Sequence, residues 1–312
     1  MFRTLTNNYH LGSGFNFRIA LLFVVMLLAS QTVLAQTDCK KGTIMSDYGL
    51  PVLEQSPAGE VHYYGDDSLQ YGELHLPEGK GPHPVVVMVH GGCWLAAFDM
   101  NHMRALANAM KDVGYAVWNI EYRRVGHPGG GWPGTFLDVA AASDHLKTLA
   151  KKYPLDMDQV VAVGHSAGGH LALWLAIRHK LTRQSEIYTT DPLPLKGVLA
   201  LEPGTTLKSI HHNRLCGHVI DGLMGGSPTQ FPNRYRDAAP MEQIPLGLPH
   251  TILVGWLSGF GLPGSTYFYT AQEAGDKQVK YVEAPESGHF EMINPDTSTW
   301  PIVLNALENL YK

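Results

Sequence analysis

Short apolar runs alternate with helical patterns along most of the chain. Residues 71–77 alternate apolar and polar side chains, as a half-buried strand does. Later runs are nearly all apolar, which is typical of strands buried on both faces of a sheet. These further strands are predicted at 84–90, 115–123, 159–166, 197–203, 250–256 and 279–285. Helices are predicted at 103–113, 135–152, 167–180 and 301–311.

Strands and helices that alternate in this way favour the α/β class, with one mostly parallel sheet covered by helices on both faces. Right-handed crossovers then bring the carboxyl ends of the parallel strands to one edge, where such sheets carry their chemistry. Residues 204–249 depart from the rhythm, since they are rich in Gly, Pro and His and have little periodicity. We interpret them as a short cap or lid inserted over that edge.

The first 35 residues have the pattern of an export signal. Arg3 and Arg18 precede the apolar run 19–29, and Val33-Leu34-Ala35 favours cleavage before Gln36. Because a membrane span needs about 20 apolar residues, an uncleaved anchor is the alternative rather than the prediction. We therefore expect a signal peptide at 1–35, one α/β domain at 36–312, a periplasmic or extracellular location, and no stable membrane association after cleavage.

Composition excludes some partners. The chain is 45% hydrophobic, carries a formal net charge of −5, and has no basic run, so nucleic acid is not expected as a partner. It has three cysteines, Cys39, Cys93 and Cys216. An exported protein can join two of them in a disulfide, but the sequence does not choose the pair, and no disulfide at all also remains open.

Gly164-His165-Ser166-Ala167-Gly168 directly follows a predicted strand and opens a predicted helix. This is the G-x-S-x-G pattern in the context that its chemistry requires. A nucleophilic serine must stand on a tight turn between strand and helix, and the flanking glycines remove side chains that would collide there. The positive end of the helix then faces the site. Ser166 is the predicted nucleophile.

His90-Gly91-Gly92-Cys93-Trp94 follows another predicted strand. Acyl transfer develops negative charge on the carbonyl oxygen, and preorganised backbone N–H groups stabilise it. We assign N–H donors to Gly92, Cys93 and Ala167, and expect Gly91 to shape the turn. His289, in Ser287-Gly288-His289 after the last predicted strand, is the predicted base because imidazole titrates near neutral pH.

The motifs HGG-x-W, GHSAGG and SGHF resemble the α/β-hydrolase esterases, in the branch of acetyl-xylan and feruloyl-type esterases, hormone-sensitive-lipase-like enzymes and kynurenine formamidases. The resemblance covers nearly all of residues 60–310. It implies the α/β-hydrolase fold, a serine acyl-transfer mechanism and no metal or organic cofactor. It also implies that Ser166, His289, Gly91 and Gly92 are functional.

The triad acid of that family is missing from its usual place. The family pattern G-x-x-D corresponds here to Gly255-Trp256-Leu257-Ser258, and no carboxylate occurs between Gly255 and Glu273. Glu202, at the end of a neighbouring predicted strand, is our preferred replacement, with Glu286 and Asp221 as further candidates. The alternatives are a slow Ser166–His289 dyad, oriented by Ser258 or a water, and a protein that has lost catalysis.

Other notable residues have simpler explanations. Asp138 is interpreted as a structural carboxylate paired with the backbone or with Arg123. The segment 211–218 is rich in histidine, but its spacing fits a lid better than a zinc site. Aromatic residues near the expected site either line a pocket or pack in the core; they are Trp94, Trp132, Trp256 and Phe260.

The sequence therefore predicts a serine carboxylic ester hydrolase that acts through an acyl-enzyme on small to medium acyl esters, either free or linked to a polysaccharide. The first alternative is an amidase such as an arylformamidase, because both reactions need the same acyl chemistry. The second is a catalytically weak or silent binding protein of the same fold.

Overall fold

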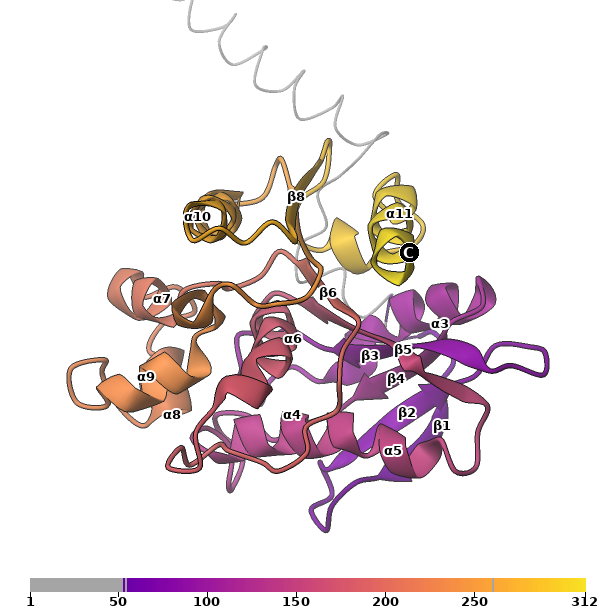
Figure 1. Cartoon of the computed structure of the whole chain (residues 1–312), viewed down its shortest axis with the longest axis horizontal. Helices are drawn as coiled ribbons and strands as arrows, with labels where there is room; N and C mark the ends of the chain where they lie inside the picture. The colour runs from indigo at the N-terminus through magenta and orange to yellow at the C-terminus, as the bar shows by residue number, and fades with distance from the viewer. Residues whose placement is uncertain (1–52, 54, 260) are drawn as a thin grey trace, which may run out of the picture. The chain divides into compact units, whose positions relative to one another are not determined.

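Eight strands form one sheet in the computed structural model, which describes residues 53, 55–259 and 261–312 (Figure 1). Their order is β1-β2-β4-β3-β5-β6-β7-β8, and only β1 and β2 run antiparallel to their neighbours. A mostly parallel sheet is thus confirmed. The strands are β1 Glu60–Tyr63, β2 Tyr71–His75, β3 His83–Val89, β4 Ala116–Ile120, β5 Leu155–His165, β6 Gly197–Leu201, β7 His250–Gly255 and β8 Val279–Ala284.

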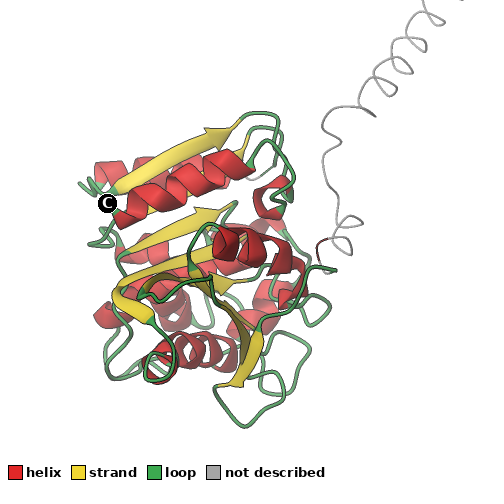
Figure 2. Ribbon diagram, turned by 90° about the vertical axis from the view of Figure 1, so that its right-hand side faces the viewer, coloured by secondary structure: helices red, strands yellow, loops and turns green. Residues whose placement is uncertain are grey.

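Helices cover both faces of this sheet, as Figure 2 shows. They are η2 Met100–Met103, α3 Arg104–Asp112, α4 Gly134–Asp144, α5 Leu146–Leu149, α6 Ala167–Ile177, η3 Arg178–Lys180, α7 Leu207–Asn213, α8 Val219–Met224, α9 Pro232–Ala238, η4 Pro240–Gln243, α10 Gly261–Glu273, η5 Glu291–Ile293 and α11 Trp300–Tyr311. Among these residues, none of the helices is long and apolar enough to cross a bilayer. The predicted signal peptide lies outside the described residues.

The central strands are buried on both faces because their successive side chains enter two different cores. Val85, Val87 and Val89 of β3 pack with α4 and α6, whereas Val86 and Met88 pack with α3 and α11. This explains why the central strands are nearly continuous apolar runs rather than alternating ones. The two cores fix the sheet rigidly, and with it the edge where the strands end.

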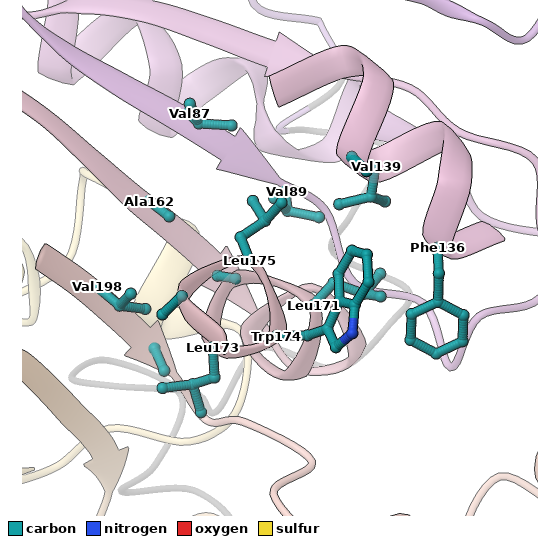
Figure 3. Packing of buried hydrophobic residues seen from close by; sticks show 14 of the residues in the cluster. Val87, Val89, Phe136, Val139, Ala162, Leu171, Leu173, Trp174, Leu175 and Val198 are labelled. Carbon is teal, nitrogen blue, oxygen red and sulfur yellow. The ribbon is translucent and has the colours of Figure 1, made fainter. Parts of the chain in front are cut away.

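Helix α6 lies in the middle of the larger core (Figure 3). Every residue from Ala167 to Ile177 is buried, which accounts for a helix that is apolar all round. Its Leu171 and Leu175 point toward β3, and the Trp174 ring meets the Phe136 ring edge-on at 5.1 Å. The helix that follows Ser166 is therefore held on all sides, so the start of the helix is a fixed platform.

Several elements differ from the sequence prediction. The helix expected at 135–152 is split at His145 into α4 and α5. Strand β1 and helix α10 were not predicted. Besides the 3-10 helix η4, the segment 204–249 contains three short α-helices, α7, α8 and α9, which lie together in Figure 1. Each has only six or seven residues, too few for a helical period to be visible in the sequence.

Candidate active site

Ser166 occupies the turn between β5 and α6. Its backbone has φ 55° and ψ −117°, a conformation that residues other than glycine rarely adopt. The strain is held by two backbone hydrogen bonds, from the Ser166 N–H to Leu201 O at 2.8 Å and from the Gly204 N–H to Ser166 O at 3.2 Å. The residue is 7% exposed. The fold thus places this serine at the sheet edge in a fixed and strained turn.

The glycines of the motif are required by close packing. A Cβ on Gly168 would collide with the backbone carbonyls of Val89 and His90, and a Cβ on Gly164 would collide with that of Gly168. On Gly91 a Cβ would lie 2.8 Å from His165 O and 3.1 Å from the Cβ of Ser166. The turn after β3 therefore lies directly against the serine turn, as the predicted oxyanion loop requires.

The Gly92-Cys93-Trp94 turn is itself strained. Its three residues have φ of 100°, 52° and 54° in succession. The backbone N–H groups of Gly92, Cys93 and Ala167 donate to no acceptor within the described part of the chain. These three donors, next to a strained serine, remain available for a substrate oxygen, and their role in catalysis stays a prediction.

A buried ionic cluster under this turn was missed by the sequence analysis. His90 lies 3.1 Å from the Glu121 carboxylate, and Arg124 also binds that carboxylate. Burial raises the pKa of Glu121, but the His90 and Arg124 charges outweigh it and lower the pKa to about 2. The Tyr122 ring stacks on His90, and its hydroxyl donates to His90 O at 2.8 Å. The cluster fixes the residue where the oxyanion turn begins.

His289 and Glu202 meet at the same edge. The His289 Nδ1 lies 3.7 Å from Glu202 Oε2, and Glu202 is fully buried, whereas the His289 side chain is 20% exposed. His165 connects this pair to the serine turn, because its Nε2 donates to His289 O at 2.9 Å and the two rings lie 4.5 Å apart. Burial, and next the neighbouring His289, hold the pKa of His165 well below its usual value. His165 is therefore a neutral support rather than a second base.

Ser258 stands where the resemblance places the family aspartate, and it contacts the replacement carboxylate. Its hydroxyl donates to Glu202 Oε2 at 2.6 Å, the same oxygen that faces His289. The backbone N–H of Gly255 donates to the other oxygen, Oε1. Glu202 has φ 49°, so its side chain leaves β6 from an unusual backbone conformation that directs it toward β7. The carboxylate thus comes from the end of β6 instead of the loop after β7, where the resemblance places the family aspartate. It still lies beside His289.

The structure places the other predicted acids elsewhere. Glu286 is exposed at a turn. Asp221 of α8 binds His211 at 2.9 Å and Arg214 at 3.1 Å within the segment 204–249. Asp138 pairs with Arg123 through two hydrogen bonds of 2.8 Å, which confirms its structural interpretation.

The remaining candidates separate into core and surface. Trp94 is buried against His170, Trp132 is half-buried, and Trp256 is 73% exposed, while Phe260 lies outside the described residues. Cys216, in the histidine-rich segment 211–218, forms a disulfide with Cys93. The bond leaves the histidine-rich segment without a free thiolate at that position.

A groove of about 330 Å³ opens beside Ser258, between α7 and the start of α10. Apolar Leu215, Leu262 and Pro263 line it together with the polar side chains of Thr206, Ser209, Asn213 and Thr266. Since Gly259 also lines it, the groove begins one residue from the partner of Glu202. None of Ser166, Glu202 and His289 is among its lining residues.

Comparison with known proteins agrees with this geometry. The sequence profile of the family described as BD-FAE matches residues 73–255, from β2 to the end of β7. The chain belongs to the BD-FAE family. The matched region of this BD-FAE member contains Ser166, Glu202 and the oxyanion turn, whereas His289 lies beyond it.

Individual relatives are distant. The chain is 22% identical to esterase LipC and 29% identical to the probable carboxylic ester hydrolase LipM, both of Mycobacterium tuberculosis. Each match covers 74% of this BD-FAE chain, but it spans only 59% and 57% of those relatives. The fold resembles that of esterase B from Lactobacillus rhamnosis with a TM-score of 0.69, at 21% identity over 92% of this chain and 93% of that one. The expected α/β-hydrolase fold and resemblance to esterases are confirmed.

Proposed function

We propose that the protein is a serine carboxylic ester hydrolase, with Ser166 as nucleophile, His289 as base and Glu202 as acid. The observation that carries the proposal is the convergence of three strand ends on one strained serine. Ser166 follows β5, Glu202 follows β6, and the oxyanion turn follows β3. The ester hydrolases among its relatives support the same reaction class.

The proposed reaction begins when His289 takes the proton of Ser166 and the serine oxygen attacks the ester carbonyl. The N–H groups of Gly92, Cys93 and Ala167 then hold the oxyanion. His289 returns the proton to the leaving alcohol, which leaves an acyl-enzyme, and a water deprotonated by His289 hydrolyses it. Throughout, the buried Glu202 carboxylate balances the positive charge of the imidazole.

The position of Glu202 argues against a silent binding protein. That alternative rested on the missing aspartate, and a fully buried carboxylate now lies 3.7 Å from His289. The amidase alternative needs the same groups, so it is separated from the esterase only by substrates. The groove beside Ser258 has room for a small or medium acyl or alcohol group, and its hydroxyl-bearing side chains also suit a sugar-linked ester.

We also propose that the protein is exported, with residues 1–35 as its signal peptide. The Cys93–Cys216 disulfide supports this location, because disulfides persist in oxidising compartments and are rare in the cytosol.

Hydrolysis of short p-nitrophenyl esters by residues 36–312 tests the proposal, beside the Ser166→Ala variant and a panel of formyl amides. We expect ester turnover that the substitution abolishes. Turnover confined to formyl amides would favour the arylformamidase. Equal inactivity of both proteins on both substrate classes would favour the binding protein.

A further inference from the structure

The Cys93–Cys216 disulfide joins the turn beside Ser166 to the cap. Cys93 lies in the middle of the strained turn after β3, and Cys216 lies in the link between α7 and α8. The two Cα atoms are 5.9 Å apart, although the residues are separated by 123 positions in sequence. The bond therefore makes the shape of one active-site loop depend on a distant segment.

Backbone hydrogen bonds hold the turn, most of them on its Trp94 side. On the Trp94 side, Val125 donates its N–H to Trp94 O at 2.9 Å, and Ala96 donates to Val125 O at 2.9 Å. The Trp94 ring is also buried. Cys93 precedes these contacts and has φ 52°, a conformation that persists only where the surroundings impose it. The Leu95 N–H closes the turn across Cys93 by donating to Gly92 O at 2.9 Å, and the bond to Cys216 adds a second constraint at Cys93.

Contacts around Cys216 hold the cap end of the disulfide, so that the disulfide can constrain the turn at Cys93. Cys216 follows the end of α7, and Asp221 of α8 binds both His211 and Arg214 on the other side of the turn. Helix α8 also packs on the body of the protein, since Gly222 lies against the Val125 side chain, so close that a Cβ there would meet Val125 Cγ1 at 2.6 Å. Val125 thus contacts both the cap and the strained turn.

We propose that Cys216 is a positioning residue for acyl transfer: its disulfide holds the Cys93 N–H in the oxyanion geometry, so full activity requires the oxidised bond. This inference rests on the proposed esterase function. Reduction by a dithiol breaks the S–S bond, passes two electrons and two protons to the cysteines, and converts the dithiol to its own disulfide. The released turn then relaxes from its strained conformation, and the donor moves out of place.

The expected signature is a change in kcat rather than in KM. An oxyanion donor acts mainly in the transition state, whereas other residues line the groove beside Ser258 that is proposed to hold part of the substrate. Removal of one such donor typically costs 10²- to 10³-fold in kcat. A displaced donor should cost less, and we expect a loss of about 10- to 100-fold with KM changed by less than about threefold.

The test compares wild type, Cys216→Ser, Cys93→Ser and the double variant on p-nitrophenyl butyrate, with and without dithiothreitol. Cys39→Ser is the matched control, because it removes the third cysteine and leaves the bond. Circular dichroism at the assay temperature establishes that each protein is folded. If the serine variants do not fold, Cys93→Ala/Cys216→Val fills the space of the bond with apolar atoms and carries the same test.

We expect reduced wild type, both single variants and the double variant to share the same low kcat, with the double variant insensitive to dithiothreitol. Cys39→Ser should behave as wild type in both conditions. Unchanged kcat in reduced, folded wild type, with all three thiols verified by titration, would overturn this inference and leave the esterase intact. Absence of any ester turnover in oxidised wild type would instead overturn the proposed function, and this inference with it.

Discussion

Glu202→Gln removes one charge from the centre of the site with little change in size. The carboxylate is fully buried, and its Oε2 lies 3.7 Å from His289 Nδ1. A glutamine oxygen still accepts from the Gly255 N–H, so the side chain keeps its anchor. Its neutral amide, however, no longer balances the imidazole cation that forms in the transition state. The substitution therefore tests the charge of Glu202 rather than its packing.

The magnitude follows from the distance. At an effective dielectric constant of about 20, two unit charges 3.7 Å apart attract each other by about 4.5 kcal/mol. At about 1.36 kcal/mol per tenfold, this corresponds to a rate loss of roughly 2,000-fold. Loss of the acid in a serine protease triad costs a comparable factor of about 10⁴. We expect kcat on p-nitrophenyl butyrate to fall by about 10³- to 10⁴-fold, with a small change in KM.

Two companion variants make the result specific. Ser258→Ala removes one hydrogen bond to Glu202 Oε2 and should lower kcat by about tenfold, since a bond to a charged group contributes about 1.5–3 kcal/mol. Glu286→Gln, an exposed carboxylate near the same edge, should keep kcat within about twofold of wild type. A Glu202→Gln enzyme with more than about a tenth of wild-type kcat would refute this account of the acid.

Three further predictions concern stability and the turn. The Cys93→Ser/Cys216→Ser protein should lose up to roughly 5 kcal/mol of unfolding free energy in urea, because the bond closes a loop of 123 positions; a loss below about 1 kcal/mol would contradict this. Gly91→Ala should lower kcat by at least about tenfold and stability by about 1–3 kcal/mol, whereas Gly261→Ala, with open space at its Cβ, should do neither. Burial, and next the charge of His90, lower the pKa of His102 to about 3, so the unfolded chain binds more protons below pH 6.5. The free energy of unfolding should therefore fall by about 2 kcal/mol from pH 8 to pH 5 because of His102. If His102→Gln had the same dependence of unfolding free energy on pH as wild type, this contribution of His102 would be excluded.

The sheet was predictable because burial on both faces leaves a clear signal. Runs such as 85–89 and 197–201 are apolar throughout, and each lies in a central strand, β3 and β6. Elements at the edge of the sheet leave a weaker signal in the sequence. Strand β1 has four residues, EVHY, and three of them are exposed, so no apolar run marks it. Helix α10 begins with glycine and proline and buries few residues, so its helical period is faint.

The site was predictable where chemistry demands a particular residue at a particular turn. Ser166 and the glycines around it follow from that demand, and Glu202 follows from the rule that parallel strands end at one edge. The disulfide was not predictable, because it depends on how the cap folds over the sheet, and the order of Cys39, Cys93 and Cys216 does not contain that information. The His90–Glu121–Arg124 cluster was missed because it joins the ends of two strands, with His90 after β3 and Glu121 and Arg124 after β4, and its members share no motif.

The proposed acyl-enzyme on Ser166 can be trapped before water hydrolyses it. Wild-type protein is mixed with p-nitrophenyl butyrate, quenched in acid within milliseconds, digested and analysed by mass spectrometry, beside Ser166→Ala. We predict one butyryl group on the peptide that contains Ser166, formed as fast as the burst of p-nitrophenol, and none in the variant. Full turnover with an unmodified Ser166 peptide, or with the acyl group on another residue, would contradict the mechanism.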